Sequence, residues 1–173
     1  MRERTREGRS GVVVGVAVAV SACGAIAQAQ QYPYAVLDLG SPAQCNSGIS
    51  YGKGINAYGQ VAGQACGIPG QAMVYFNGQK TYLEVVWGLL DTTTDMNDAG
   101  VVVGGAYSDL GFPYQSDAVV WFNGEATILS NLGGGSHGAT GVNESGVICG
   151  GSEGLDGISH VVLWIDGQIV DLG

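Results

Sequence analysis

Positively charged side chains are scarce in this chain. It has six Lys and Arg residues against fifteen Asp and Glu residues, and four of the six basic ones lie within the first nine positions. Beyond residue 29, thirteen acidic side chains stand against Lys53 and Lys80 alone, a net charge near −11. Because so acidic a surface repels phosphate groups, we expect neither nucleic acid nor an anionic membrane as a partner.

A stretch long enough to span a membrane is also lacking. The apolar stretch at residues 11–20 is about half of the roughly 20 residues that a spanning helix needs. It follows a basic head, and Ala27-Gln28-Ala29 then fits the small-x-small pattern of signal-peptide cleavage. The sequence therefore predicts a signal peptide at residues 1–29 and a secreted, extracellular or periplasmic mature protein. The alternative is a lipid anchor on Cys23, because residues 20–23 resemble the lipobox of bacterial lipoproteins.

Cysteine is sparse as well, with four residues in the whole chain. Removal of the signal peptide leaves Cys45, Cys66 and Cys149, an odd number for an oxidising compartment. Cys45 and Cys66 flank the first hairpin predicted below, so we predict a disulfide between them. Cys149 lies within an apolar stretch and is expected to be a buried small hydrophobic residue.

Groups of residues that carry chemistry are few. The two His residues, His137 and His160, are too few for a zinc site, which usually needs three or four ligands. Residues 134–138 match the pattern GxSxG, but a nucleophile elbow needs a strand before it and a helix after it. Residues 95–100 begin like a calcium loop, yet Ala106 stands where a closing ligand is required. We therefore expect no catalytic residue, no metal and no cofactor, and we expect that the chain is not an enzyme.

Against these absences stands an internal repeat, the strongest feature of the chain. A motif that begins with an apolar residue, continues Asn-x-x-Gly and ends in a second Gly occurs at residues 55–63, 96–104 and 142–150. Asn at the first position and Gly at the fourth favour a type I turn. Each copy therefore predicts a β-hairpin.

A second turn follows each of these hairpins. Asn77-Gly78, Asn123-Gly124 and Asp166-Gly167 each lie between two apolar runs. Such dipeptides favour type I′ turns, in which both central residues need positive φ. Each repeat is therefore predicted to hold four short antiparallel strands.

The middle strands of each predicted repeat are apolar at consecutive positions, as at residues 101–103, which is typical of strands covered on both faces. Stacked four-stranded sheets of this kind suit the blades of a β-propeller. We predict an all-β repeat domain at residues 30–173. Its expected parts are a strand at 34–39 and three repeats at about 41–86, 87–129 and 130–173.

Three repeats are fewer than a closed propeller normally has. The sequence therefore predicts a partial propeller or one completed in a homo-oligomer. A threefold arrangement similar to a β-trefoil or β-prism is the alternative.

The motifs of this chain resemble the HAF-type extracellular repeat family of bacterial exported proteins. The resemblance covers residues 34–173 and rests on Asp-Leu-Gly at 38–40 and 171–173, on the three Asn-x-x-Gly turns, and on Trp121 and Trp164 before their turns. The His-Ala-Phe tripeptide itself is absent, and only His160 keeps its His. The resemblance implies export and repetition and carries no established activity.

The longest connection between predicted strands, residues 105–117, carries the candidate ligand-binding residues. These are Tyr107, Asp109, Phe112 and Tyr114. Loops on a rigid β scaffold are where binding usually resides, so the sequence favours a non-catalytic module that binds an extracellular polymer or protein or serves a structural role. The alternatives are a secreted glycan hydrolase using Asp91, Asp95 or Asp109, and a truncated fragment without an independent role.

Overall fold

The computed structural model of the protein describes residue 38 and residues 50–65, 70–86, 90–108 and 115–173. The predicted signal peptide, the strand at 34–39 apart from Asp38, and Cys23, Cys45 and Cys66 lie outside these residues. The described part consists of strands and turns and contains no helix, so it contains none that could cross a membrane as a helix.

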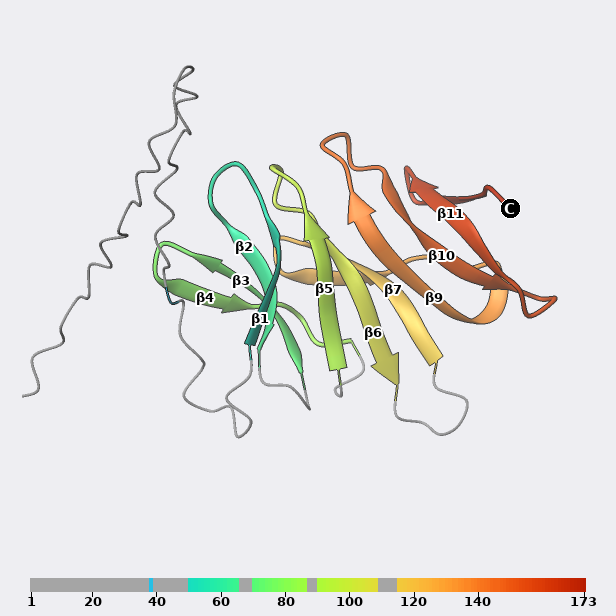
Figure 1. Ribbon diagram of the computed structural model, residues 1–173, viewed down its shortest axis with the longest axis horizontal. Helices are drawn as coiled ribbons and strands as arrows, with labels where there is room; N and C mark the ends of the chain where they lie inside the picture. Colours follow the sequence, from blue (N-terminus) through green and yellow to red (C-terminus); the bar gives the residue numbers. More distant parts are fainter. Residues whose placement is uncertain (1–37, 39–49, 66–69, 87–89, 109–114) are drawn as a thin grey trace, which may run out of the picture. The chain divides into compact units, whose positions relative to one another are not determined.

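In the described residues, twelve strands form three four-stranded antiparallel sheets, and within each sheet the strands are neighbours in chain order. The sheets follow one another along the chain in Figure 1. Repeat 1 comprises β1 (Ser50–Ile55), β2 (Val61–Ala65), β3 (Gln71–Phe76) and β4 (Gln79–Tyr82). Repeat 2 comprises β5 (Leu90–Met96), β6 (Val102–Ser108), β7 (Gln115–Phe122) and β8 (Glu125–Ile128). Repeat 3 comprises β9 (Gly133–Val142), β10 (Ile148–Gly154), β11 (Ser159–Ile165) and β12 (Gln168–Asp171). The predicted all-β architecture of four-stranded antiparallel repeats is confirmed, whereas its arrangement as a propeller or as a threefold trefoil or prism stays a prediction.

Both turns of each repeat have the predicted chemistry. In the first turn of repeat 1 the Gly59 amide donates to the Asn56 carbonyl at 3.0 Å, and repeats 2 and 3 form the same bond at 3.1 Å and 3.0 Å. In the second turn both central residues have positive φ, 48° and 82° for Asn77 and Gly78 in repeat 1, and the other two repeats match. Local turn residues therefore specify these six hairpins.

A β-bulge interrupts the first strand of every repeat at the same place. In repeat 2 the bulge includes Thr94. The bulge brings a carbonyl of that strand against a glycine on the second strand. A Cβ on Gly104 would collide with the carbonyl oxygen of Thr92, and Gly63 and Gly150 lie in the same situation. The last Gly of the sequence motif is therefore required by the bulge.

The sheets pack on one another through two apolar clusters. β5 lies against β1, β2 and β3, and β9 lies against β5, β6 and β7. Val102 belongs to the cluster between repeats 1 and 2, while its neighbour Val103 belongs to the cluster between repeats 2 and 3. The predicted burial of the middle strands on both faces is confirmed for repeat 2.

One tryptophan anchors each of these two junctions. Trp121 and Trp164 are buried, and their indole nitrogens donate to the carbonyls of Glu84 at 2.9 Å and Ser130 at 2.8 Å. Each acceptor lies just after the fourth strand of the preceding repeat. The connection between two repeats is thus fixed by the ring of the later one.

A hydrogen-bond ladder joins the first turns of the three repeats. The side-chain amide of Asn56 donates to the Asn97 carbonyl at 3.3 Å, and that of Asn97 donates to the Asn143 carbonyl at 3.0 Å. Beside them the Ala57 amide donates to Asp98 Oδ1 at 2.7 Å, and the Asp98 amide donates to Glu144 Oε2 at 3.0 Å. The turn asparagines therefore hold neighbouring repeats together as well as bending the chain.

We call the face by which repeats 1 and 2 pack on the following repeat the forward face, and the face by which repeats 2 and 3 pack on the preceding repeat the backward face. The equivalent faces of repeats 3 and 1 carry the same names. Register places Cys149 at the forward position held by Ala62 in repeat 1 and Val103 in repeat 2, both fully buried. Cys149 itself is exposed and free. The expectation that it is buried is wrong, because no described residue covers the forward face of repeat 3 at this position.

Candidate functional site

Of the four ligand-binding candidates from sequence, the structure describes one. Tyr107 lies near the end of β6, where it pairs with Leu90 and Ser116, and its side chain is 40% exposed. Asp109, Phe112 and Tyr114 lie outside the described residues. Tyr107 is therefore available to a ligand, while its grouping with the other three stays a prediction.

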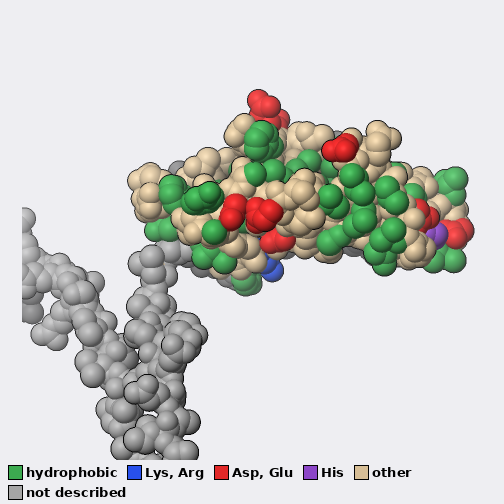
Figure 2. All heavy atoms as spheres, turned by 90° about the horizontal axis from the view of Figure 1, so that it is seen from above, with side chains coloured by type: hydrophobic (Ala, Val, Ile, Leu, Met, Phe, Trp, Pro, Cys, Tyr) green, Lys and Arg blue, Asp and Glu red, His purple; other side chains and the backbone are tan. Residues whose placement is uncertain are grey.

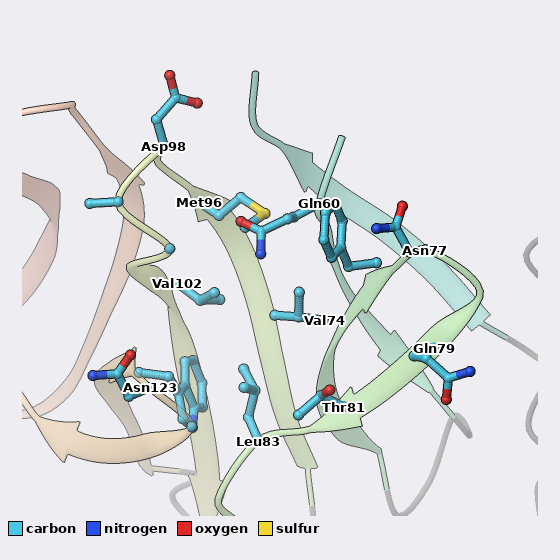
Figure 3. Close-up of a pocket in the computed structure, with 15 residues that line it drawn as sticks. Gln60, Val74, Asn77, Gln79, Thr81, Leu83, Met96, Asp98, Val102 and Asn123 are labelled. Carbon is cyan, nitrogen blue, oxygen red and sulfur yellow. The ribbon is translucent and has the colours of Figure 1, made fainter. Parts of the chain in front are cut away.

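A groove of about 520 Å³ opens between repeats 1 and 2, at the end of the sheets where the second turns lie. Figure 3 shows Met96, Val74 and Val102 along its length, with Gln60 and Asp98 toward one end and Asn123 toward the other. Its lining residues come from both sheets: Gln60, Val74, Phe76, Asn77, Gln79, Thr81, Leu83, Met96, Asp98, Ala99, Gly100, Val102, Trp121, Asn123 and Gly124.

The floor of the groove is apolar and its rim is polar. Met96, Leu83 and Val102 are buried beneath it, and Phe76 is 39% exposed on one wall. Around the rim lie the amides of the Asn and Gln residues, which can donate and accept hydrogen bonds at once. An apolar floor with a few placed polar groups is typical of sites that bind small or extended neutral ligands.

One polar residue of the rim, Gln60, departs from the repeat pattern. Gln60 occupies the position of Val101 in repeat 2 and of Val147 in repeat 3, and Val101 packs against the apolar cluster of its junction. Gln60 Oε1 instead accepts the side-chain amide of Asn56 at 2.7 Å. The same amide reaches the Asn97 carbonyl only at 3.3 Å, a longer rung than the 3.0 Å rung of the next junction.

Asp98 is the ionisable side chain among the residues that line the groove. Its Oδ1 accepts the Ala57 amide at 2.7 Å. General acid and base work on a glycosidic bond needs two facing carboxyl groups, and the groove offers one that is already bonded.

Two of the carboxylates proposed for hydrolysis each accept a backbone amide in the structure. Asp91 is 1% exposed, and one of its oxygens accepts the Val86 amide at 3.1 Å. Burial raises the pKa of Asp91, while the bond from Val86 lowers it by less. Asp95 Oδ2 accepts the Val142 amide of repeat 3 at 3.0 Å. The third candidate, Asp109, lies outside the described residues.

The GxSxG segment does not form an elbow. Ser136 and His137 lie within strand β9, and the strand is followed by the first turn of repeat 3. The imidazole of His137 is buried, with Nε2 at 3.0 Å from the Leu129 carbonyl and Nδ1 at 3.6 Å from Asp117 Oδ1. Because a carbonyl oxygen only accepts, Nε2 carries the proton and donates to Leu129, and the Nδ1 side of the ring faces Asp117.

Acidic side chains are spread over the surface without forming a metal site. The described residues hold no group of three or more His, Cys, Asp and Glu side chains that could bind an ion. In Figure 2 the red acidic side chains lie among green hydrophobic ones, and blue appears only at the lower edge of the described surface. His160 interacts with Asp171 at 2.9 Å and with Asp156 at 3.8 Å.

Comparison of the chain with protein-family models, with curated proteins and with solved structures gives no match. The resemblance to HAF-type repeats therefore stays a prediction. Sequence reasoning also missed the groove, although one signal was present. Gln60 is a polar residue at a repeat position where Val101 and Val147 are apolar.

Proposed function

We propose that this chain is an exported, non-catalytic β-repeat protein that works outside the cytoplasm as a binding module of the HAF-type extracellular class. The observation that carries the proposal is the groove between repeats 1 and 2, with its apolar floor and amide rim. The ladder bond from Asn56 and the Trp121 anchor support it, because they join the two sheets that form the groove walls.

The ligand we propose is a neutral polysaccharide. Sugar hydroxyls pair well with side-chain amides, which donate and accept together, and an exposed ring such as Phe76 offers a stacking surface. The net charge near −11 of residues 30–173 disfavours polyanions by repulsion. A neutral extracellular polymer fits both the groove and the charge.

Native electrophoresis through gels that contain a soluble polysaccharide tests this directly, because the acidic chain migrates well toward the anode. Residues 30–173 should be retarded in gels with neutral hydroxyethyl cellulose, xylan or mixed-linkage glucan, and not in gels with polygalacturonate. The variant Gln60→Val places the residue of repeats 2 and 3 in the groove. It should fold at least as stably and lose the retardation.

Gln168→Val is the matched control, since it makes the same change at an exposed site on β12 of repeat 3. It should leave retardation unchanged. If none of the neutral polymers retards the wild-type chain, or if Gln60→Val is retarded as strongly as wild type, the groove is not the binding site. Release of reducing ends from these polymers would instead favour the hydrolase alternative.

Export itself is tested by the mass of the product from a bacterial host. Cleavage after Ala29 predicts a chain that begins at Gln30 and is recovered from the periplasm or medium. A chain that begins at Cys23 and carries acyl groups would show the lipid-anchored alternative.

A further inference from the structure

The forward face of repeat 3 carries the same kind of residues that are buried on the forward faces of repeats 1 and 2. Ala72 and Ala118 are fully buried at one forward position, and Val161 at the same position of repeat 3 is 57% exposed. Leu83 and Leu129 are buried at another, where Leu172 is 57% exposed. With the exposed Cys149, these side chains form an apolar face that matches two covered ones.

Hydrogen-bond donors at the edge of this face are also unused. In repeat 2 the side-chain amide of Asn97 and the backbone amide of Asp98 donate across the junction to repeat 3. Their counterparts are the side-chain amide of Asn143 and the backbone amide of Glu144. Within the described part of the chain neither donates to any residue. The ladder thus ends with its donors free.

The complementary half of the junction lies at the other end of the same three sheets. Ile55 of repeat 1 is equivalent to Met96 of repeat 2 and Val142 of repeat 3 on the backward face. The side chain of Ile55 is 69% exposed, whereas that of Met96 is 5% exposed. The Asn56 carbonyl accepts the amide of Gly59. The carbonyls of Asn97 and Asn143 each accept a bond from the preceding repeat. The Asn56 carbonyl has a second lone pair with which it could accept the equivalent bond.

We propose that a second copy of this chain docks head to tail, with the backward face of its repeat 1 on the forward face of repeat 3. This contact would be the third instance of an interface that the chain already forms twice. It buries Val161, Leu172 and Cys149, and it gives the free amide of Asn143 the Asn56 carbonyl as its acceptor. The surface is distinct from the groove, so the inference does not depend on the ligand.

Pairing of two forward faces is less favourable on the same grounds. Such a contact would set donor against donor at Asn143, and unpaired buried donors cost about 1–3 kcal/mol each. The head-to-tail contact satisfies this donor. The second rung, from the Glu144 amide, is missing in this contact, because Ala57 stands where Asp98 and Glu144 provide carboxylate acceptors in the internal junctions.

Sedimentation velocity of residues 30–173 from micromolar to millimolar concentration tests the proposal. Moderate ionic strength is needed, because two acidic copies repel one another. The wild-type chain should show a mass that rises with concentration. Val161→Asp and Ile55→Asp should each weaken the association about tenfold or more, since each buries a charge in the contact. Leu155→Asp, at an 88% exposed site in the β10–β11 turn, is the control and should associate like wild type.

Mixing the two disrupted variants distinguishes the orientation. Val161→Asp retains an intact backward face on repeat 1, and Ile55→Asp retains an intact forward face on repeat 3. Head-to-tail docking therefore predicts that an equimolar mixture forms a one-to-one dimer that grows no further. A wild-type chain that stays monomeric at every concentration overturns the proposal. Association of Ile55→Asp alone at wild-type strength, without gain on mixing, overturns it too. Circular dichroism confirms that each variant is folded.

Discussion

At the scale of single residues, glycine has two separate roles in this repeat. Gly78, Gly124 and Gly167 adopt positive φ in the second turns, where the residue type follows from backbone conformation. Gly104 does not have positive φ. Glycine is required there because a side chain would not fit. Its missing Cβ makes room for the carbonyl of Thr92 at the bulge.

Gly104→Ala should therefore destabilise the protein by about 2–3 kcal/mol, as overpacking against a rigid backbone does. Gly105→Ala is the neighbouring control, because a Cβ there would have its nearest neighbour, the Asp117 carbonyl oxygen, at 3.6 Å. Its cost should stay below about 1 kcal/mol. Urea unfolding of both variants measures the difference. Equal losses would show that the bulge does not select glycine.

The raised pKa of Asp91 predicts how the free energy of unfolding depends on pH. A carboxyl group with a raised pKa binds its proton more tightly in the folded state. Its contribution to stability therefore falls as pH rises from the unfolded pKa of about 3.9 toward the folded one. Asp91→Asn removes this term and can still accept the Val86 amide. The variant should gain stability relative to wild type as pH rises through that window.

The control for this comparison is Asp166→Asn, in an exposed turn where the other two repeats have Asn77 and Asn123. Free energies of unfolding are measured from acid to neutral pH. If the two variants differ from wild type by parallel curves, burial of Asp91 is not the source of a pH-dependent cost.

At the scale of elements, the hairpins could be predicted from sequence and the junctions could not. Asn56-x-x-Gly59 and Asn77-Gly78 specify their turns through local backbone preferences, which need no knowledge of the rest of the fold. The ladder depends on where the Asn56 side chain lies relative to Asn97, 41 residues away. Sequence spacing gives the repeat length, but it does not say which atoms of two repeats meet.

The ladder predicts that equivalent asparagines differ in their contribution to stability. Both Asn97 and Asn143 accept backbone amides of their own turns. Of these two, Asn97 alone also donates to a following repeat within the described residues. Asn97→Ala should therefore cost about 1–2 kcal/mol more than Asn143→Ala, the worth of a bond across the junction. Denaturant unfolding of dilute protein checks it. A larger loss for Asn143→Ala would contradict the assignment of the ladder.

At the scale of the whole molecule, every junction between repeats uses one set of positions, and their exposure depends on whether a neighbour is present. Cys149 was expected to be buried because it lies within an apolar stretch, and the equivalent Val103 is fully buried. The expectation holds for a repeat with a successor and is wrong for repeat 3. Likewise the groove forms where residues of two sheets meet, Gln60 among them, and composition alone does not locate it.

The reactivity of two equivalent thiols tests this account most directly. In dilute solution Cys149 should react with iodoacetamide like an exposed thiol. A cysteine placed by Val103→Cys in a Cys149→Ser chain should react about a hundredfold more slowly or less, because it must await local opening. Peptide mapping by mass spectrometry separates these sites from Cys45 and Cys66. Equal rates at the two sites, or a protected Cys149 in the monomer, would contradict the claim that repeat 3 leaves open the face that repeats 1 and 2 bury.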